Sequence, residues 1–275
     1  MSDTPPRWGE IERSGRPEYF VGYLDKVTAQ SEIQRYKRRT YQLLEVGPGA
    51  RVLDVGCGTG DDAIALAGLV DPGGAVVGID NSASIIEEAR RRVVARALPV
   101  ELRTGDAHCL DIPDDSFDAC RADRVLMHLR DQEAALAEMV RVTRPGGRVV
   151  VREPDWDTLV IDGPDRALTR ALLHGHFDRV IRNGGSGRQL YRLLRRAGLI
   201  EVEVADTSTL VLTDYATANQ LYGLEAAASA LAELEPSSRE RAADWLRQLQ
   251  EADRQGQFFS AVTGFTVIGR KPVRA

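Results

Sequence analysis

The sequence has few of the residues that hold small secreted domains or metal centres together. Its 275 residues include only three cysteines, Cys57, Cys109 and Cys120, at irregular spacings that match no zinc-ligand pattern. Such cysteine usage is typical of a reducing compartment, so we expect a cytoplasmic protein with no bound metal. There is no run of about 18 apolar residues and no apolar stretch after the polar N-terminus, so neither a membrane span nor a secretory signal is predicted.

The sequence also has fewer basic than acidic residues. There are 36 Lys and Arg residues against 41 Asp and Glu, which gives a formal net charge of −5. Phosphate backbones are usually bound by basic domains, so this balance argues against nucleic acid as the main partner. The rest of the composition, 43% hydrophobic and 28% charged, is that of a soluble globular protein. A chain of this length can bury a large core without a disulfide or a metal.

Short apolar segments alternate with amphipathic ones along most of the chain. Strands are predicted at residues 51–55, 75–80, 100–103, 117–121, 148–152, 200–212 and 258–270. Helices are predicted at residues 63–70, 84–97, 133–142, 165–183, 189–197 and most of 213–255, with a break at Pro236. Short strands that are apolar on both faces and separated by such helices indicate a parallel sheet covered by helices on both sides. No flexible linker divides the chain, so we predict a single domain.

The first 45 residues precede this alternation. Residues 1–18 are rich in proline, glycine and charge, and we expect them to form a loose arm. From residue 19 to residue 45, apolar side chains at helical spacing predict one helix, which Gly47-Pro48-Gly49 ends.

A glycine-rich loop follows the first predicted strand. The segment Val52-Leu-Asp-Val-Gly-Cys-Gly-Thr-Gly-Asp-Asp62 runs from a strand through three alternating glycines into a helix. Glycine permits a tight turn and lets a ligand approach the backbone closely. The first strand–helix turn of an open parallel sheet is also where nucleotides bind. The sequence therefore predicts a nucleotide-type site at this loop.

Three kinds of ligand compete for the loop. A triphosphate loop needs a lysine after its last glycine, and none is present. A dinucleotide loop needs glycine or alanine where Asp61 stands, and Asp54 and Asp62 nearby are expected to repel a pyrophosphate. Unit charges ~4 Å apart at an effective dielectric constant of about 20 interact by about 4 kcal/mol. A cation without phosphates, such as the sulfonium S-adenosylmethionine, fits an acidic loop better.

The loop resembles the cofactor motif of class I S-adenosylmethionine-dependent methyltransferases. The resemblance extends over about residues 40–155 and is carried by Asp54-Val-Gly-Cys-Gly-Thr-Gly60, Asp80, Thr104-Gly-Asp-Ala107, Phe117-Asp118 and Arg144-Pro-Gly-Gly-Arg148. Within this family, the sequence most resembles the branch that includes ubiquinone/menaquinone C-methyltransferases and natural-product O-methyltransferases. The resemblance has structural implications as well. It implies an α/β fold with a Rossmann-like, mostly parallel seven-stranded sheet, helices on both faces and a helical lid.

The resemblance also implies the residues that hold the cofactor. In the family, the residue matching Asp80 binds both ribose hydroxyls, and the residue matching Asp106 meets the adenine amino group. The candidate cofactor-binding residues are Asp54, Gly56, Cys57, Gly58, Gly60, Asp80, Asn81, Asp106, Ala107 and Arg124. We interpret Cys57 as a small spacer and not as a nucleophile, because nothing basic in the sequence is committed to activating it.

Candidate catalytic residues follow the fourth and fifth predicted strands. Methyl transfer from a sulfonium is an in-line displacement, which needs a base only if the acceptor must lose a proton. His128 is the candidate base, since histidine accepts protons near neutral pH; many relatives carry a further histidine at the position of Met127. Glu153 and Asp155 are candidates for binding an acceptor hydroxyl or orienting His128. A packing histidine and a solvated acidic loop are the competing interpretations of these residues.

Aromatic residues outside the predicted sheet indicate an acceptor pocket. The candidates for its lining are Tyr19, Phe20, Tyr23, Trp156 and His176, for which ordinary helix packing is the competing interpretation. We predict an N-terminal arm and lid helix at residues 1–45, a cofactor-binding core at 46–155 and an acceptor-side half at 156–275. The helical insertion at 213–255 is expected to fold over the cofactor together with the N-terminal helix.

The sequence is compatible with four functions of this protein, which it supports to different degrees. The favoured one is methyl transfer to an O, N or C atom of a small molecule, such as a secondary metabolite or a quinone-like compound. A nucleic-acid or protein methyltransferase is disfavoured, since the sequence lacks an Asn-Pro-Pro-Tyr-like motif and a basic patch with interleaved aromatics. The third is a dinucleotide oxidoreductase, and the fourth is a cofactor-binding relative that transfers no methyl group, such as a cyclase or scaffold. A homodimer is the candidate assembly.

Overall fold

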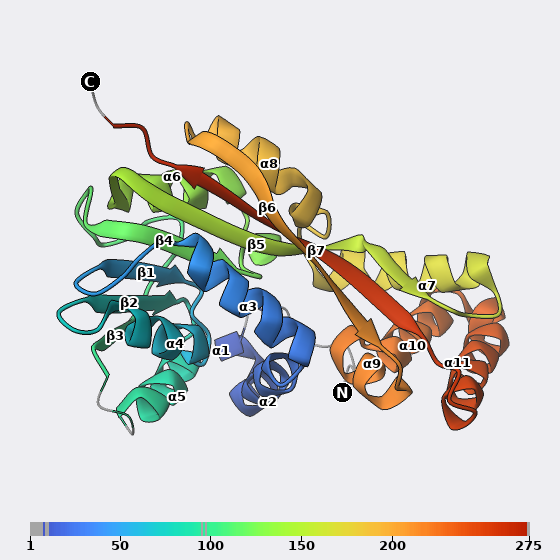
Figure 1. Cartoon of the computed structure of the whole chain (residues 1–275). Helices are drawn as coiled ribbons and strands as arrows, with labels where there is room; N and C mark the ends of the chain where they lie inside the picture. The colour runs from blue at the N-terminus through green and yellow to red at the C-terminus, as the bar shows by residue number, and fades with distance from the viewer. Residues whose placement is uncertain (1–7, 9–10, 95, 97, 274–275) are drawn as a thin grey trace.

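One twisted sheet organises the fold (Figure 1). The computed structural model describes residues 8, 11–94, 96 and 98–273. The strands of the sheet are β1 (Arg51–Val55), β2 (Ala75–Asp80), β3 (Val100–Thr104), β4 (Phe117–Asp123), β5 (Thr143–Ile161), β6 (Ile200–Leu212) and β7 (Ser260–Arg270). Their order is β3-β2-β1-β4-β5-β7-β6, with β7 antiparallel to both of its neighbours and the other pairs parallel. The predicted mostly parallel seven-stranded α/β sheet is confirmed.

Helices cover both faces of the sheet. One face is covered by α3 (Ser31–Leu43), α4 (Asp61–Val70) and α5 (Ala83–Val94), and the other by α6 (Gln132–Val142) and α8 (Ser186–Arg196). Successive strand residues point to opposite faces, so Val52 packs in the cluster with Leu66, while Leu53 packs in the cluster with Leu136. Burial on both faces explains why these strands are continuous apolar runs.

Strand β5 is much longer than predicted. The sequence indicates residues 148–152, whereas the observed strand continues to Ile161. The extension pairs with β7, from Arg148 opposite Arg270 to Ile161 opposite Ser260, with a register shift after Asp155. The expected acidic loop at Glu153 to Asp155 is therefore part of the sheet. Pairing with a strand more than 100 residues later determines this conformation, and local sequence does not show it.

Four of the helices after β5 gather at the far end of the long strands (Figure 1). They are α7 (Arg166–Val180), α9 (Tyr215–Tyr222), α10 (Leu224–Leu234) and α11 (Arg239–Arg254), with a short 3₁₀ turn at Pro236–Ser238; another 3₁₀ turn, Leu126–His128, follows β4. The expectation that residues 213–255 form a lid over the cofactor is largely wrong. Buried residues of α10 and α11, such as Leu224 and Trp245, pack with Leu172 of α7 in one hydrophobic cluster. Only α9, through its last two residues, reaches the cavity described below.

The N-terminal region forms three helices in place of the one predicted. They are α1 (Ile11–Ser14), α2 (Pro17–Thr28) and α3, and extended backbone at Gln30 separates α2 from α3. The break lets α3 lie on the sheet while α2 turns toward the open end of β1 and β2 (Figure 1). Half of the expected loose arm, residues 1–7, 9 and 10, lies outside the described residues, and residues 11–14 and 17–18 of the other half are helical. No helix in the described ranges has the length and apolar character needed to cross a membrane.

Candidate active site

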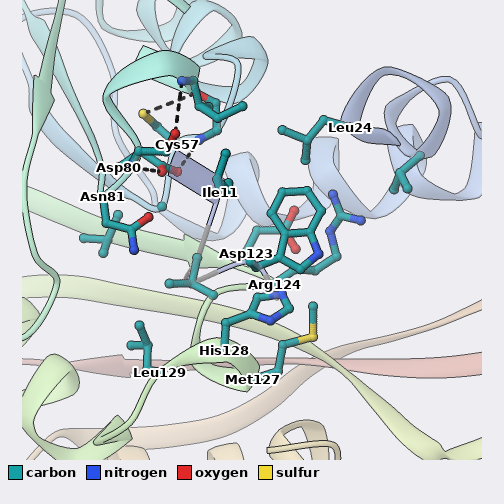
Figure 2. Close-up of a pocket in the computed structure, with 18 of the residues that line it drawn as sticks. Ile11, Leu24, Cys57, Asp80, Asn81, Asp123, Arg124, Met127, His128 and Leu129 are labelled. Atoms are coloured by element: carbon teal, nitrogen blue, oxygen red, sulfur yellow. Dashed lines mark hydrogen bonds between the residues drawn. The ribbon is translucent and has the colours of Figure 1, made fainter. Parts of the chain in front are cut away.

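A cavity of about 840 Å³ lies at the carboxyl ends of the parallel strands. The strand order reverses between β1 and β4, which is where open parallel sheets bind ligands. The lining joins the glycine loop, the ends of β2 and β3, the turn after β4, and α1 and α2. It continues into an apolar chamber between β5, β6, β7, α7 and α9. Figure 2 shows Asp80 and Asn81 on one side and Met127 and His128 on the other.

The glycine loop takes a shape that other residues can hardly adopt. Gly56, Gly58 and Gly60 have positive φ angles of 69°, 52° and 83°. The Gly56 nitrogen donates a 2.7 Å hydrogen bond to the oxygen of Ile79, which fixes the loop against the end of β2. A Cβ atom on Gly56 would lie 2.3 Å from a methyl group of Val125. The loop and the turn after β4 are therefore in direct contact, with no room for a side chain between them.

Asp80, the last residue of β2, points into the cavity beside this loop (Figure 2). One carboxylate oxygen accepts a 3.1 Å hydrogen bond from the Gly58 nitrogen, and the other accepts one of 3.1 Å from the Ser82 nitrogen. Burial raises the pKa of Asp80, and these backbone hydrogen bonds oppose the rise. Each oxygen has two lone pairs, so the carboxylate can still accept hydrogen bonds from two hydroxyl groups of a ligand.

Asp106 and Ala107 line the same end of the cavity, after β3. Asp106 accepts a 2.9 Å hydrogen bond from the His108 nitrogen, which holds the pKa of its carboxyl group below the usual value. Glu12 of α1 reaches this end as well, and its carboxylate accepts hydrogen bonds from Ser82 and Ser84 at the start of α5. Carboxylates therefore surround the Asp80 end of the cavity.

Asp54 and Asp62 do not act as the sequence suggested. Asp54 does not line the cavity; it is buried and accepts a 2.8 Å hydrogen bond from Arg121. Burial raises the pKa of Asp54 to about 6, and Arg121 opposes this rise. Asp62 pairs with Lys37 and Arg121, which hold its pKa low despite burial. These charges are compensated within the protein, so the expected repulsion of a pyrophosphate by them is not supported. Gly60 also lies outside the lining, packed against Ala89 of α5.

The Asp80 end fits the nucleoside part of S-adenosylmethionine. Its carboxylate has free acceptor positions for a ribose diol, and the glycine loop exposes backbone at close range. Asp106 and Ala107 would hold the adenine, and the carboxylates of Glu12 and Asp80 favour a cationic ligand. Burial raises the pKa of the Cys57 thiol, so Cys57 lines the site as a small neutral group. The fold and this geometry together are those of an enzyme with room for an adenosyl cofactor at the reversal of strand order.

Comparison with known proteins agrees with this class. A family of methyltransferase domains matches residues 47–198, more than half of the chain, and the chain belongs to this family. It is an S-adenosylmethionine-dependent methyltransferase. A 37.1 kDa protein of transposon Tn4556 from Streptomyces fradiae is 42% identical over 267 residues, which cover 95% of this chain and 74% of that protein.

Two further proteins are similar over different shares of the chain. Demethylmenaquinone methyltransferase of Bacillus cereus is 37% identical over 138 residues, and the match covers 50% of this chain and 58% of the relative. The chain thus spans little more than half the length of that enzyme. The structure of YcgJ from Bacillus subtilis has a TM-score of 0.64 at 20% identity and covers 88% of this chain and all of that one, which shows a shared fold.

The turn after β4 separates the two ends of the cavity. Arg124 has a positive φ angle of 58°, and the 3₁₀ turn Leu126–His128 follows it. The His128 ring lines the cavity and lies 5.8 Å from the Trp8 ring. Burial, with a smaller contribution from Arg124, lowers the pKa of His128 to about 3. Its ring is therefore uncharged at neutral pH, and the role of His128 as a base stays a prediction.

Glu153 lies underneath this turn and does not line the cavity. It is fully buried, and one carboxylate oxygen accepts hydrogen bonds of 2.7 Å from the Val125 nitrogen and 2.6 Å from the Leu126 nitrogen. Its other oxygen has no hydrogen-bond partner within the described ranges. Burial raises the pKa of Glu153 to about 8. Its position suits a residue that holds the turn carrying His128, which agrees with the predicted orienting role, whereas the predicted contact with an acceptor hydroxyl has no counterpart in the cavity lining.

The Glu153→Gln substitution is expected to remove a pH dependence of stability. The pKa of about 8 in the folded state exceeds the ordinary 4.5, so the folded state keeps a proton that the unfolded state loses. This contribution to stability is complete below pH 4.5 and is lost as the pH rises through 8. Urea unfolding measures the free energy of unfolding at each pH. Between pH 5 and pH 8 this free energy should fall by up to about 4 kcal/mol more in the unsubstituted protein than in the variant. Glu233→Gln, at an exposed position of α10, is the control. Parallel pH curves for the protein and the Glu153 variant would refute the assignment.

Four other predicted residues lie away from the cavity lining. Asp155 is buried and pairs with Arg188, because its strand continues where a loop was expected. Phe20 is buried against α5, and Tyr19, its neighbour on α2, is 42% exposed. His176 is buried against Gly223, which lies before α10. None of these four side chains lines the cavity as the sequence predicted.

Two of the predicted pocket residues, Tyr23 and Trp156, do line the cavity. Sequence reasoning missed further lining residues, among them Trp8, Glu12, Arg152, Leu210, Tyr222 and Val262. Trp8 and Glu12 fall in the segment that composition indicated as a loose arm. The others come from strands and helices whose pairing is settled only in the folded chain, so no local signal marks them.

Proposed function

We propose that the enzyme transfers the methyl group of S-adenosylmethionine to an O, N or C atom of a small, partly aromatic acceptor, such as a secondary metabolite or a quinone-like compound. The observation that carries this proposal is the continuity of the cavity. One space extends from Asp80 to a chamber lined by Met127, Trp156, Leu210, Tyr222 and Val262. Such an apolar, aromatic lining suits a planar organic molecule.

The residues of the chain would act mainly by positioning. The bound cofactor supplies a methyl group on an already activated sulfonium, so alignment of the acceptor provides much of the rate. Asp80 and the glycine loop hold the nucleoside, and the turn after β4 forms the wall between nucleoside and acceptor. Helices α1 and α2 cover the site and exclude water, with Ile11, Tyr23 and Leu24 facing the cavity. His128 lines the cavity as an uncharged group at neutral pH.

We further propose that three consecutive segments of the chain have different functions. Residues 1–45 act as the cover, residues 46–155 hold the cofactor, and residues 156–275 shape the acceptor chamber. This division is supported by the lining, which takes Asp80 and Asp106 from the second segment and Leu210 and Tyr222 from the third. A cytoplasmic location and a homodimer remain predictions from the sequence.

Transfer of an isotope-labelled methyl group tests the proposed function. The enzyme is incubated with methyl-labelled S-adenosylmethionine and a panel of phenols, hydroxyquinones and aromatic amines, and products are separated by mass spectrometry. We expect label in at least one acceptor and an equimolar amount of S-adenosylhomocysteine. Conversion of a panel compound to an unlabelled isomer would instead indicate a cyclase. S-adenosylhomocysteine binding without transfer to any member would count against this acceptor class.

A further inference from the structure

Among the arginines that line the cavity, the buried Arg152 and the half-buried Arg124 lie next to the turn after β4. Arg124 and Arg152 are neighbours, since the Arg124 nitrogen donates a 2.9 Å hydrogen bond to the oxygen of Arg152. Within the described part of the chain, neither guanidinium has a carboxylate oxygen within 4 Å, and the buried Nε of each lacks a hydrogen-bond partner. Arginines that are buried without a paired anion are costly, so they call for an explanation.

Arg152 is held in place by contacts with an aromatic ring and a hydroxyl group, and its charge acts on the Asp123 carboxylate only from beyond 4 Å. Its side chain is 4% exposed, and the guanidinium lies 3.8 Å from the centre of the Tyr36 ring. One terminal nitrogen donates a 3.3 Å hydrogen bond to the Ser208 hydroxyl. Gly264 makes room for it, since a Cβ there would come within 2.3 Å of the same nitrogen. A rigid, preorganised guanidinium next to a cavity is suited to a planar anion.

The nearest acidic group is already shared by other partners. Asp123 accepts a 3.2 Å hydrogen bond from Arg121 and one of 3.3 Å from the Tyr36 hydroxyl, and it lies 3.4 Å from Lys37. The carboxylates of Glu12, Asp80 and Asp106 lie at the nucleoside end of the cavity. The positive charge of the bound cofactor would add to that of Arg124 and Arg152. The acceptor chamber therefore combines an apolar lining with two guanidinium groups that have no carboxylate oxygen within 4 Å in the described part of the chain.

We propose that the acceptor carries an anionic group, a carboxylate or a planar equivalent, on its apolar frame, and that Arg152 binds this group while Arg124 adds to the positive field. The inference rests on the proposed function and narrows its substrate class. The planar fork of an arginine matches the two oxygens of a carboxylate. Leu210 and Val262, which line the same chamber, would contact the apolar frame. Arg152 is thereby a specificity-determining residue.

Paired ligands that differ only in charge test this inference. The enzyme saturated with S-adenosylhomocysteine is titrated with 1-hydroxy-2-naphthoate and with 1-hydroxy-2-naphthamide, and binding is followed by calorimetry. We expect the acid to bind about tenfold tighter than the amide, since charged hydrogen bonds contribute at least that much. In Arg152→Gln the preference should fall to about twofold or less. Arg152→Lys keeps the positive charge but loses the planar fork of the guanidinium. Its preference for the acid should lie between that of the unsubstituted protein and that of Arg152→Gln.

Control variants and a second ligand isolate the role of Arg152. Arg170→Gln, at an exposed position of α7, removes one positive charge outside the cavity lining and should keep the acid preference. Affinity for S-adenosylhomocysteine should be unchanged in the Arg152 variants, which shows that they fold and that Arg152 does not serve the cofactor. Equal binding of acid and amide, no binding of either, or an unchanged preference in Arg152→Gln would overturn the proposal. Retained acid preference without methyl transfer would count against the proposed function alone.

Discussion

Replacing Asp80 with alanine is expected to weaken S-adenosylhomocysteine binding about 10- to 100-fold, or about 1–3 kcal/mol. The variant loses both oxygens available to a ribose diol. It also removes the acceptors of the Gly58 and Ser82 nitrogens, so the glycine loop loses a tether as well as a ligand contact. Isothermal titration of the purified variant measures the change directly.

The matched variants separate the two effects at this position. Asp80→Asn keeps the shape and one acceptor oxygen, so we expect a loss smaller than that of the alanine variant. Asp111→Ala removes an exposed carboxylate outside the cavity lining and should bind the ligand normally. Normal binding by Asp80→Ala would mean that the adenosyl group lies elsewhere in the cavity.

Replacing Gly56 with alanine is expected to destabilise the fold by about 2–5 kcal/mol and to abolish cofactor binding. The φ angle of 69° costs a residue with a side chain about 1–2 kcal/mol. The new methyl group would lie 2.3 Å from Val125, so either the loop or the turn after β4 must move. Urea unfolding and ligand titration report the two consequences separately.

Two further variants test this explanation. Gly68→Ala, in α4 where nothing lies within 4 Å of the new atom, should be neutral or stabilising by up to about 1 kcal/mol. Adding Val125→Ala to Gly56→Ala should recover part of the lost stability, because it removes the clashing methyl groups. If the double variant is no more stable than Gly56→Ala, the whole loss of stability comes from the backbone conformation at residue 56 and none from the contact with Val125.

The parallel half of the fold could be predicted because its signals are local. Short apolar strands bounded by glycine and proline can be recognised from the sequence alone. Asp80 ends β2 and Asp106 follows β3 by two residues, so the positions of both are known once the strands are recognised. The family resemblance then assigns them to the cofactor. These residues line the cavity as expected.

The acceptor half could not be predicted because its signals are not local. Whether Arg152 or Glu153 faces the cavity depends on which face of β5 carries α3, and the length of β5 depends on β7. The low pKa of His128 follows from burial, which no residue spacing reveals. Trp8 lines the cavity from a segment whose composition resembles that of a flexible arm.

The alternation along β5 makes the chemistry of the chamber sensitive to insertions. Arg152 and Glu153 are adjacent, one facing the chamber and the other supporting the turn from behind. A slip of the strand by one residue in one direction would put Glu153 in the place of Arg152 and bring a carboxyl group into the chamber, whereas a slip in the other direction would put Val151 there. In homologous chains, a single-residue deletion between residues 148 and 152 should therefore accompany a reversal in the charge of the molecule that is methylated, whereas an insertion should remove the preference for an anion.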